Sequence, residues 1–185
     1  FLVPLALKIS SALAGADNAF VVQALRSRLR GRELDPFAAW MANVFIELAA
    51  IKYVQASGRR LGEIVFAGDT LEALPERKYD LVIGNPPFGR VRLPEHLRTR
   101  FAAGLYGHAN LYGLFMHAAI DICADHGIVA LITPTSYLGG QYFTNLRRLL
   151  IERAPPIAFD LVLQRRDVFR SVLQETAVSY FRKGG

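Results

Sequence analysis

The order of hydrophobic and polar positions divides the chain into segments with helical spacing and shorter apolar runs that are typical of strands. The helical spacing predicts helices over residues 2–13, 36–54, 110–127 and 141–154. The shorter runs predict strands over residues 28–34, 63–69, 80–84, 128–134, 157–163 and 175–183. Strands alternate with helices until the last two strands, which follow one another directly. This order predicts an α/β fold, with a doubly wound, mostly parallel sheet that ends in an antiparallel hairpin.

Two of the predicted strands, "DLVIG" (80–84) and "IVALITP" (128–134), have no polar alternation. Such runs are expected where both faces of a strand are covered. In doubly wound sheets, ligands bind beyond the carboxyl ends of the strands. Glu33, Asp69 and the segment Asn85 to Phe88 all lie at such ends. We therefore expect the functional site there.

Composition excludes several classes of protein. The chain has 185 residues, of which 52% are hydrophobic and 21% charged, as expected for one globular domain rather than a disordered chain. No apolar stretch reaches the roughly 18 residues that a membrane span needs. The apolar start "FLVPLAL" lacks the basic region and cleavage site of a secretory signal. With a single cysteine, Cys123, and four histidines without ligand spacing, we expect neither disulfides nor a metal site.

Charge leaves two interpretations open. The net charge is +6 and the pI about 9.8. A basic balance attracts polyanions such as nucleic acids, although solvated helix faces give the same composition. The arginines occur in clusters: Arg26, Arg28, Arg30 and Arg32; Arg59 and Arg60; Arg90, Arg92, Arg98 and Arg100; Arg165, Arg166 and Arg170.

Three carboxylates follow or end predicted strands. Asp35 precedes Pro36 and is expected to cap the helix that begins there. Glu33 is then the better placed of the two to accept hydrogen bonds from ribose hydroxyls. Asp69, in "AGDTL", either accepts a hydrogen bond from the exocyclic amine of an adenine or stabilises a turn. The sequence leaves these alternatives for Asp69 open.

The segment "NPPF", Asn85 to Phe88, is the most specific feature of the chain. The amide of Asn85 offers an acceptor oxygen, and the carbonyl of Pro86 is a second acceptor in a rigid frame, since proline has no backbone N–H. Two fixed acceptors suit an NH2 group, and Phe88 can stack on a planar base or amide. A proline-rich turn after a strand is the alternative. The order of strand, amide, prolines and aromatic residue favours the amino-group site.

These residues resemble the catalytic motif of amino-group methyltransferases that use S-adenosylmethionine. The resemblance extends over nearly the whole chain and is to DNA adenine-N6 methyltransferases of the Taq and Eco57I types, which belong to restriction–modification systems. It implies a Rossmann-like methyltransferase fold. It is carried by "GRELDPFAAWMAN", "AGDTL", "IGNPPF", "NLYGLFMHAAIDICADHGIVALITPTSYL" and "DVFRSVLQETAVSYF".

The resemblance implies a direct, in-line transfer of a methyl group to the N6 amino group of an adenine flipped out of double-stranded DNA. Asn85 and the Pro86 carbonyl would bind the amino group, with Pro87 completing the rigid frame. Phe88 would stack on one face of the base, and Phe169 would contact the other face or the edge. No covalent cysteine intermediate is needed.

The resemblance also implies S-adenosylmethionine as the cofactor. Glu33 would bind its ribose and Asp69 its adenine. Thr70 departs from the family, where larger apolar residues are common at this position. The full set of expected cofactor-binding residues is Glu33, Leu34, Asp69, Thr70, Asn85 and Phe115.

The family's glycine-rich cofactor loop and its first strand would lie before Phe1, and no target-recognition domain is recognisable. We therefore expect residues 1–185 to be part of the catalytic domain of a longer restriction–modification or phage-defence enzyme and to be inactive alone. The resemblance implies a bacterial or archaeal protein of the cytoplasm, associated with the nucleoid.

Other functions use similar motifs. A glutamine-N5 methyltransferase that acts on release factors, or an RNA base methyltransferase, also carries "NPP" and an aromatic residue. A non-catalytic DNA-binding or scaffold fragment is a third possibility, supported by the missing loop. The segment "NLYGLF" and the terminal hairpin favour DNA as the substrate.

Overall fold

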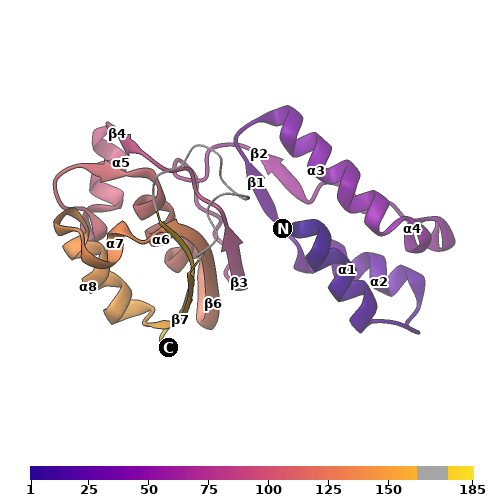
Figure 1. The fold of residues 1–185 in the computed structure, drawn as a ribbon. Coiled ribbons are helices and arrows are strands. Elements are labelled where there is room, and N and C mark those ends of the chain that lie inside the picture. The colour runs from indigo at the N-terminus through magenta and orange to yellow at the C-terminus, as the bar shows by residue number, and fades with distance from the viewer. Residues whose placement is uncertain (162–174) are drawn as a thin grey trace. The chain divides into compact units, whose positions relative to one another are not determined.

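The computed structural model describes residues 1–161 and 175–185, which form two compact units. The first unit is Phe1–Ala73 and the second Leu74–Gly185. The first contains α1 (Leu2–Ala12), α2 (Asn18–Arg28), β1 (Gly31–Glu33), α3 (Pro36–Ala49), α4 (Ile51–Ser57) and β2 (Val65–Ala67) (Figure 1).

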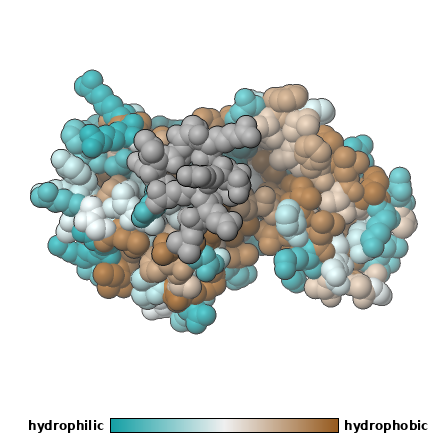
Figure 2. Space-filling view, in the orientation of Figure 1, coloured by the Kyte–Doolittle hydropathy of each residue, from teal (hydrophilic) through white to brown (hydrophobic). Residues whose placement is uncertain are grey.

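In the first unit, β1 and β2 pair in parallel from Gly31 opposite Val65 to Glu33 opposite Ala67. Helices α1, α2 and α3 contribute to one hydrophobic core with the segment before β2, through Ala6, Val21, Leu25, Ile46, Leu61 and Ile64. Burying these side chains stabilises the unit, because apolar surface is removed from water. Hydrophobic side chains also gather over α3 in Figure 2, where Phe37, Trp40 and Leu48 are exposed.

The predicted helix over residues 36–54 is broken. It ends as α3 at Ala49 and resumes as α4 at Ile51, with 71° between the two helices. Asp35 caps α3 as predicted, since its Oδ1 accepts a hydrogen bond of 2.8 Å from the Ala38 N–H. Neither proline nor glycine causes the break. Ala50, at the bend, is fully buried, and after it Tyr53 packs against the core and donates a hydrogen bond to the Ser10 carbonyl. Tertiary packing therefore decides the direction of α4.

The second unit contains a four-stranded sheet in the order β3-β6-β8-β7. Strand β3 is parallel to β6, while β8 is antiparallel to both β6 and β7. The predicted α/β fold and its antiparallel terminal hairpin are thus confirmed. The elements are β3 (Tyr79–Gly84), β4 (Arg90–Val91), α5 (Glu95–Arg100), η1 (Ala102–Gly104), β5 (Ala109–Asn110), α6 (Leu111–Ile122), β6 (Cys123–Pro134), α7 (Ser136–Gly139), η2 (Gln141–Phe143), α8 (Thr144–Arg153), β7 (Pro156–Leu161) and β8 (Thr176–Arg182).

Helices α6 and α8 share one core with the sheet (Figure 1). Val129 and Leu131 of β6 and Phe181 of β8 are buried in it. The expectation that both faces of β3 are covered is wrong for Leu81, whose side chain is 45% exposed. Strand β3 is at the edge of this four-stranded sheet, and its side chains are less completely buried than those of the central strand β6.

The prediction that a helix continues to Gly127 is wrong. Helix α6 ends at Ile122, and Cys123 is the buried first residue of β6. His126 adopts a left-handed backbone conformation with φ of 63°. Its N–H donates to the carbonyl of Lys183, and the Lys183 N–H donates to the carbonyl of Gly127. Pairing with the chain beyond β8 thus overrides the helical spacing of this segment.

Helices α2 and α5 and the short strands β4 and β5 were not predicted. No single helix in the described part of the chain is long and apolar enough to cross a membrane. The pair α3 and α4 meets the length and composition test only when both helices are taken together across their bend.

Ser179 connects three elements through buried hydroxyls. Its Oγ lies 3.1 Å from the Thr133 Oγ1 and accepts a hydrogen bond of 2.9 Å from the Tyr137 hydroxyl. Ser179→Ala leaves both partners buried without this bond, so we expect a loss of about 2 kcal/mol in the free energy of unfolding. Urea denaturation measures this loss. Ser11→Ala, on the exposed side of α1, is the control and should change stability by less than about 0.5 kcal/mol. Equal effects would contradict the assignment.

Candidate active site

The segment Asn85 to Phe88 begins where β3 ends. Gly84, the last residue of β3, pairs with Leu131 of β6, so the start of the segment is fixed by the sheet. Asn85 is exposed and Pro86 buried, while Pro87 is exposed and Phe88 half-buried. The strand therefore delivers an accessible amide next to a rigid, anchored proline.

The other end of the segment is fixed as well. Gly89 has φ of 122°, a conformation that favours glycine, and its carbonyl accepts a hydrogen bond of 2.9 Å from the Leu111 N–H. The next residue, Arg90, pairs with Asn110 in the antiparallel ladder of β4 and β5. Residues 85–88 are thus held between the sheet and the start of α6.

The ring of Phe88 lies against an aromatic chain. Its centroid is 6.2 Å from that of Tyr112, with an edge-to-face angle of 79°, and Tyr112 lies 5.2 Å from Phe143. The Tyr112 hydroxyl lies 2.9 Å from the Ser136 Oγ. Burial raises the pKa of Tyr112 to about 12, since the charged phenolate is disfavoured away from water. Tyr112, which the sequence analysis did not single out, therefore positions Phe88.

The carboxylates of the first unit lie at the ends of its paired strands. The Gly68 N–H donates to the carbonyl of Glu33, which brings the chain after β2 beside the end of β1. One oxygen of Glu33, Oε1, accepts from the Asp35 N–H at 3.2 Å. Oδ1 of Asp69 accepts from the Leu71 N–H at 2.8 Å, so the turn role that the sequence left open for Asp69 is present. The structure thus brings Glu33 and Asp69 to the same edge.

Asn43 of α3 fixes the start of β2. Its Oδ1 accepts hydrogen bonds from the N–H groups of Ile64 and Val65, both at 2.9 Å. Its Nδ2 donates to the carbonyls of Val65, at 2.8 Å, and Ala39, at 3.1 Å. Asn43 was not predicted to have a role. Its spacing with Ala39 and Ile46 on the buried side of α3 is a pattern from which a buried, hydrogen-bonded amide could have been inferred.

The remaining predicted residues are spread over both units. Leu34 is 70% exposed and Thr70 half-buried, both in the first unit. Phe115 is half-buried on α6, three residues after Tyr112. Phe169 lies outside the described residues. Among the described residues, no three histidine, cysteine, aspartate or glutamate side chains converge as metal ligands would.

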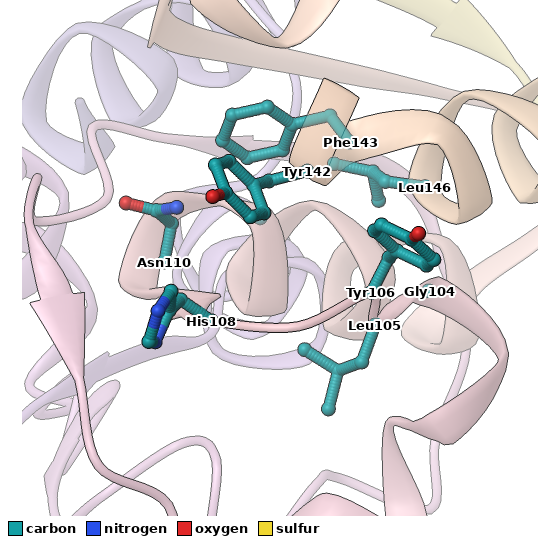
Figure 3. Close-up of a pocket in the computed structure, with 9 residues that line it drawn as sticks. Gly104, Leu105, Tyr106, His108, Asn110, Tyr142, Phe143 and Leu146 are labelled. Carbon is teal, nitrogen blue, oxygen red and sulfur yellow. The ribbon is translucent and has the colours of Figure 1, made fainter. Parts of the chain in front are cut away.

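A pocket in the second unit lies beside the ladder of β4 and β5 (Figure 3). Side chains from the loop before β5 and from η2 line it, among them Tyr106, His108, Asn110, Tyr142 and Phe143. The ring of Tyr142 has two neighbours: the centroid of the His108 ring is 5.9 Å away, and the guanidinium of Arg90 lies 6.0 Å from the Tyr142 centroid. Neither Tyr142 nor His108 is among the site residues predicted from the sequence.

The raised pKa of Tyr112 predicts a loss of stability at alkaline pH. Its pKa is about 12 in the folded chain against 10.0 for a free tyrosine, so its contribution is complete below pH 10 and is lost as the pH rises towards 12. We expect Tyr112→Phe to lower stability by about 1 kcal/mol at pH 8, through the lost Ser136 contact. Its stability should then fall less steeply than that of the wild type between pH 10 and 12. Denaturation titrations across this range measure both slopes, and equal slopes would contradict the prediction.

Removing the Asn43 amide should destabilise the first unit. In Asn43→Ala, the N–H groups of Ile64 and Val65 lose their acceptor, so we expect a loss of about 2–3 kcal/mol. Asn43→Asp keeps an acceptor and loses only the two donated bonds, so it should cost less. Hydrogen exchange at Ile64 and Val65 measures the effect locally, and unchanged protection in Asn43→Ala would refute it.

Comparison with known proteins identifies the family. The Eco57I restriction-modification methylase model matches residues 37–169. Type II methyltransferase M.PaeR7I of Pseudomonas aeruginosa is 30% identical over 83% of this chain and 28% of its own length. M.BsuBI of Bacillus subtilis is 29% identical over 63% of this chain and 24% of its own length. The chain thus spans about a quarter of these relatives.

Solved structures show the same fold. The M protein of the type I restriction enzyme EcoKI superposes with a TM-score of 0.66 at 25% identity, over 85% of this chain and 31% of that one. A chain from a type I restriction–modification complex gives 0.72 at 21% identity, over 100% and 36%. The family and the fold imply S-adenosylmethionine as the cofactor. Since the family model covers more than half of its residues, the chain belongs to the Eco57I restriction-modification methylase family.

Proposed function

We propose that this chain supplies the amino-group site, and part of the cofactor site, of a DNA methyltransferase that acts on the N6 amino group of a flipped-out adenine. The main support is the geometry of the segment Asn85 to Phe88. It is held at both ends, the Asn85 side chain is exposed, and the Phe88 ring contacts Tyr112. Positioned groups of this kind accelerate a reaction by fixing geometry before it begins.

The segment offers acceptors where an amino group needs them. The Oδ1 of Asn85 and the carbonyl of Pro86 would each accept one hydrogen of the adenine NH2, and Pro87 stiffens the backbone. When both hydrogens of the NH2 group are donated to these acceptors, the electron density on the nitrogen increases. A flipped base has lost its partner and its stack, so the amino group is free for these bonds.

Phe88 would replace the lost stacking on one face of the adenine. The contact between its ring and that of Tyr112 restricts the orientation of Phe88 before the base arrives. Stacking of a base on an aromatic side chain contributes about 1–3 kcal/mol. Phe169 would contact the other face or the edge of the base.

The carboxylates suit the donors of the cofactor. S-adenosylmethionine, when bound, supplies an electrophilic methyl group. Glu33 and Asp69 each use one oxygen for a backbone N–H, and the second can accept from the ribose hydroxyls and the adenine amine, respectively. Ionised carboxylates can only accept hydrogen bonds, so these two side chains suit a ligand that presents N–H and O–H donors at the ends of β1 and β2. Leu34, Thr70 and Phe115 are proposed to line the adenine.

DNA is the proposed partner because of charge and family. The net charge of +6 favours a polyanion. The solved relative LlaBIII, described as bound to DNA, shares the fold at a TM-score of 0.69 and 13% identity. The DNA complex is a property of LlaBIII, and a methylation assay on duplex DNA tests the substrate of this chain.

Asn85→Ala should abolish methylation while leaving DNA binding intact. Losing one fixed polar contact to the reacting group should lower kcat on the order of 100-fold or more. Asn85→Asp, which keeps the acceptor oxygen, is the matched control and should retain part of the activity. The assay follows methyl transfer to duplex DNA by a methylation-competent protein that contains these residues, with the modified nucleoside identified by mass spectrometry.

Three results would contradict the proposal. Asn85→Ala could keep its activity, the product could be a methylated cytosine, or RNA or a protein glutamine could accept the methyl group in place of DNA. The first result would remove the catalytic role of Asn85, and the other two would change the substrate.

A further inference from the structure

We propose that Arg90, His108, Asn110 and Tyr142, here called the Tyr142 surface, bind the nucleotide next to the flipped adenine on the same DNA strand. The guanidinium of Arg90 would contact its phosphate, and the ring of Tyr142 would stack on its base. This inference rests on the proposed function, since it takes DNA as the substrate.

The Tyr142 surface combines a cation with exposed rings. Tyr142 is 47% exposed, and both Arg90 and His108 are exposed. The Arg90 guanidinium lies 6.0 Å from the Tyr142 ring centroid, and the His108 ring lies 5.9 Å from it at an angle of 57°. An aromatic ring beside a cation is the combination that binds single nucleic-acid strands, where the ring stacks on a base and the charge attracts the backbone.

Gly107 packs its backbone against the ring of Tyr142. Gly107 has φ of 67°, and a Cβ placed on it would lie 3.3 Å from Cδ1 of Tyr142. A larger residue at this position would be strained and would crowd the ring. Glycine therefore lets the loop before β5 approach Tyr142 closely.

Asn110 adds a side chain that can read a base edge. It occupies the position before the first residue of α6, yet its amide makes no capping hydrogen bond. In Figure 3 the amide lies near both His108 and Tyr142 at the pocket. An amide offers both donors and an acceptor, which match the edge of a base.

The Tyr142 surface continues the proposed amino-group site. Arg90 follows Phe88 by two residues, so their Cα atoms are at most about 7 Å apart. Arg90 is fixed there because it pairs with Asn110, and the neighbouring Leu111 N–H binds the Gly89 carbonyl. A DNA strand that places its flipped adenine on Phe88 would therefore bring the adjoining nucleotide towards Arg90 and Tyr142.

Charge favours an anionic occupant. In the part of the chain that the structure describes, no ion pair joins Arg90 to a carboxylate. Its guanidinium is exposed and free to approach a phosphate. If Arg90 and Tyr142 only pack on each other, removing either side chain should leave the affinity for DNA unchanged.

The test measures the affinity of the methylation-competent protein that contains these residues for a fluorescent duplex with one unpaired adenine, by anisotropy over a range of salt concentrations. Tyr142→Ala should weaken binding at least about fivefold, the factor that corresponds to the lower limit of one stacked base. Tyr142→Phe keeps the ring and should bind like the wild type. Arg90→Gln should lower the slope of log affinity against log salt by about one.

Arg148→Gln is the charge control, since Arg148 is an exposed arginine on α8. It should leave both affinity and salt slope unchanged, and thermal unfolding should show that all variants are folded. Wild-type affinity in Tyr142→Ala, an equal loss in Arg148→Gln, or tighter binding to RNA of the same sequence would overturn the inference.

The two proposals fail in different ways. If Asn85→Ala retains methylation while Tyr142→Ala loses DNA affinity, the catalytic assignment is wrong and the Tyr142 surface stands. If Asn85→Ala abolishes adenine methylation while Tyr142→Ala and Arg90→Gln bind DNA normally, the Tyr142 surface is wrong and the catalytic assignment stands.

Discussion

The attachment of residues 85–88 at both ends is the constraint on which the candidate site depends. At one end Gly84 belongs to β3 and pairs with Leu131, and at the other the Leu111 N–H holds the Gly89 carbonyl. A segment fixed at only one end would lose much more conformational entropy when a base binds. The prolines reduce that entropy further, because their φ angles are already set.

This constraint links the site to the core of the second unit. Helix α6 begins at Leu111, which holds the Gly89 carbonyl, and the next residue, Tyr112, contacts Phe88. Tyr112 and Phe143 belong to, or pack against, the core that α6 and α8 form with the sheet. Mutations in this core should therefore disturb Phe88 without touching any substrate.

The carboxylates of the first unit depend on a similar device. Strands β1 and β2 have only three residues each, so their ladder alone fixes little. Asn43 adds three hydrogen bonds from α3 to the start of β2 and the residue before it, and a fourth to Ala39 within α3. One amide on the buried side of α3 thus fixes where the chain enters the short strand that precedes Asp69.

The sequence by itself determined the family and the α/β class, and it singled out "NPPF" as the candidate site segment. The family resemblance, which the comparison confirms, the alternation of strands and helices, and the "NPPF" segment are all properties of local order. Tertiary structure decided what depends on distant partners. Lys183 draws Cys123 to Gly127 out of the predicted helix, buried Ala50 marks the turn of α4, and the contacts of Tyr112 and Tyr142 join residues far apart in the chain. Such contacts leave no periodic signal, because hydrophobic spacing records which side of an element is buried and not what covers it.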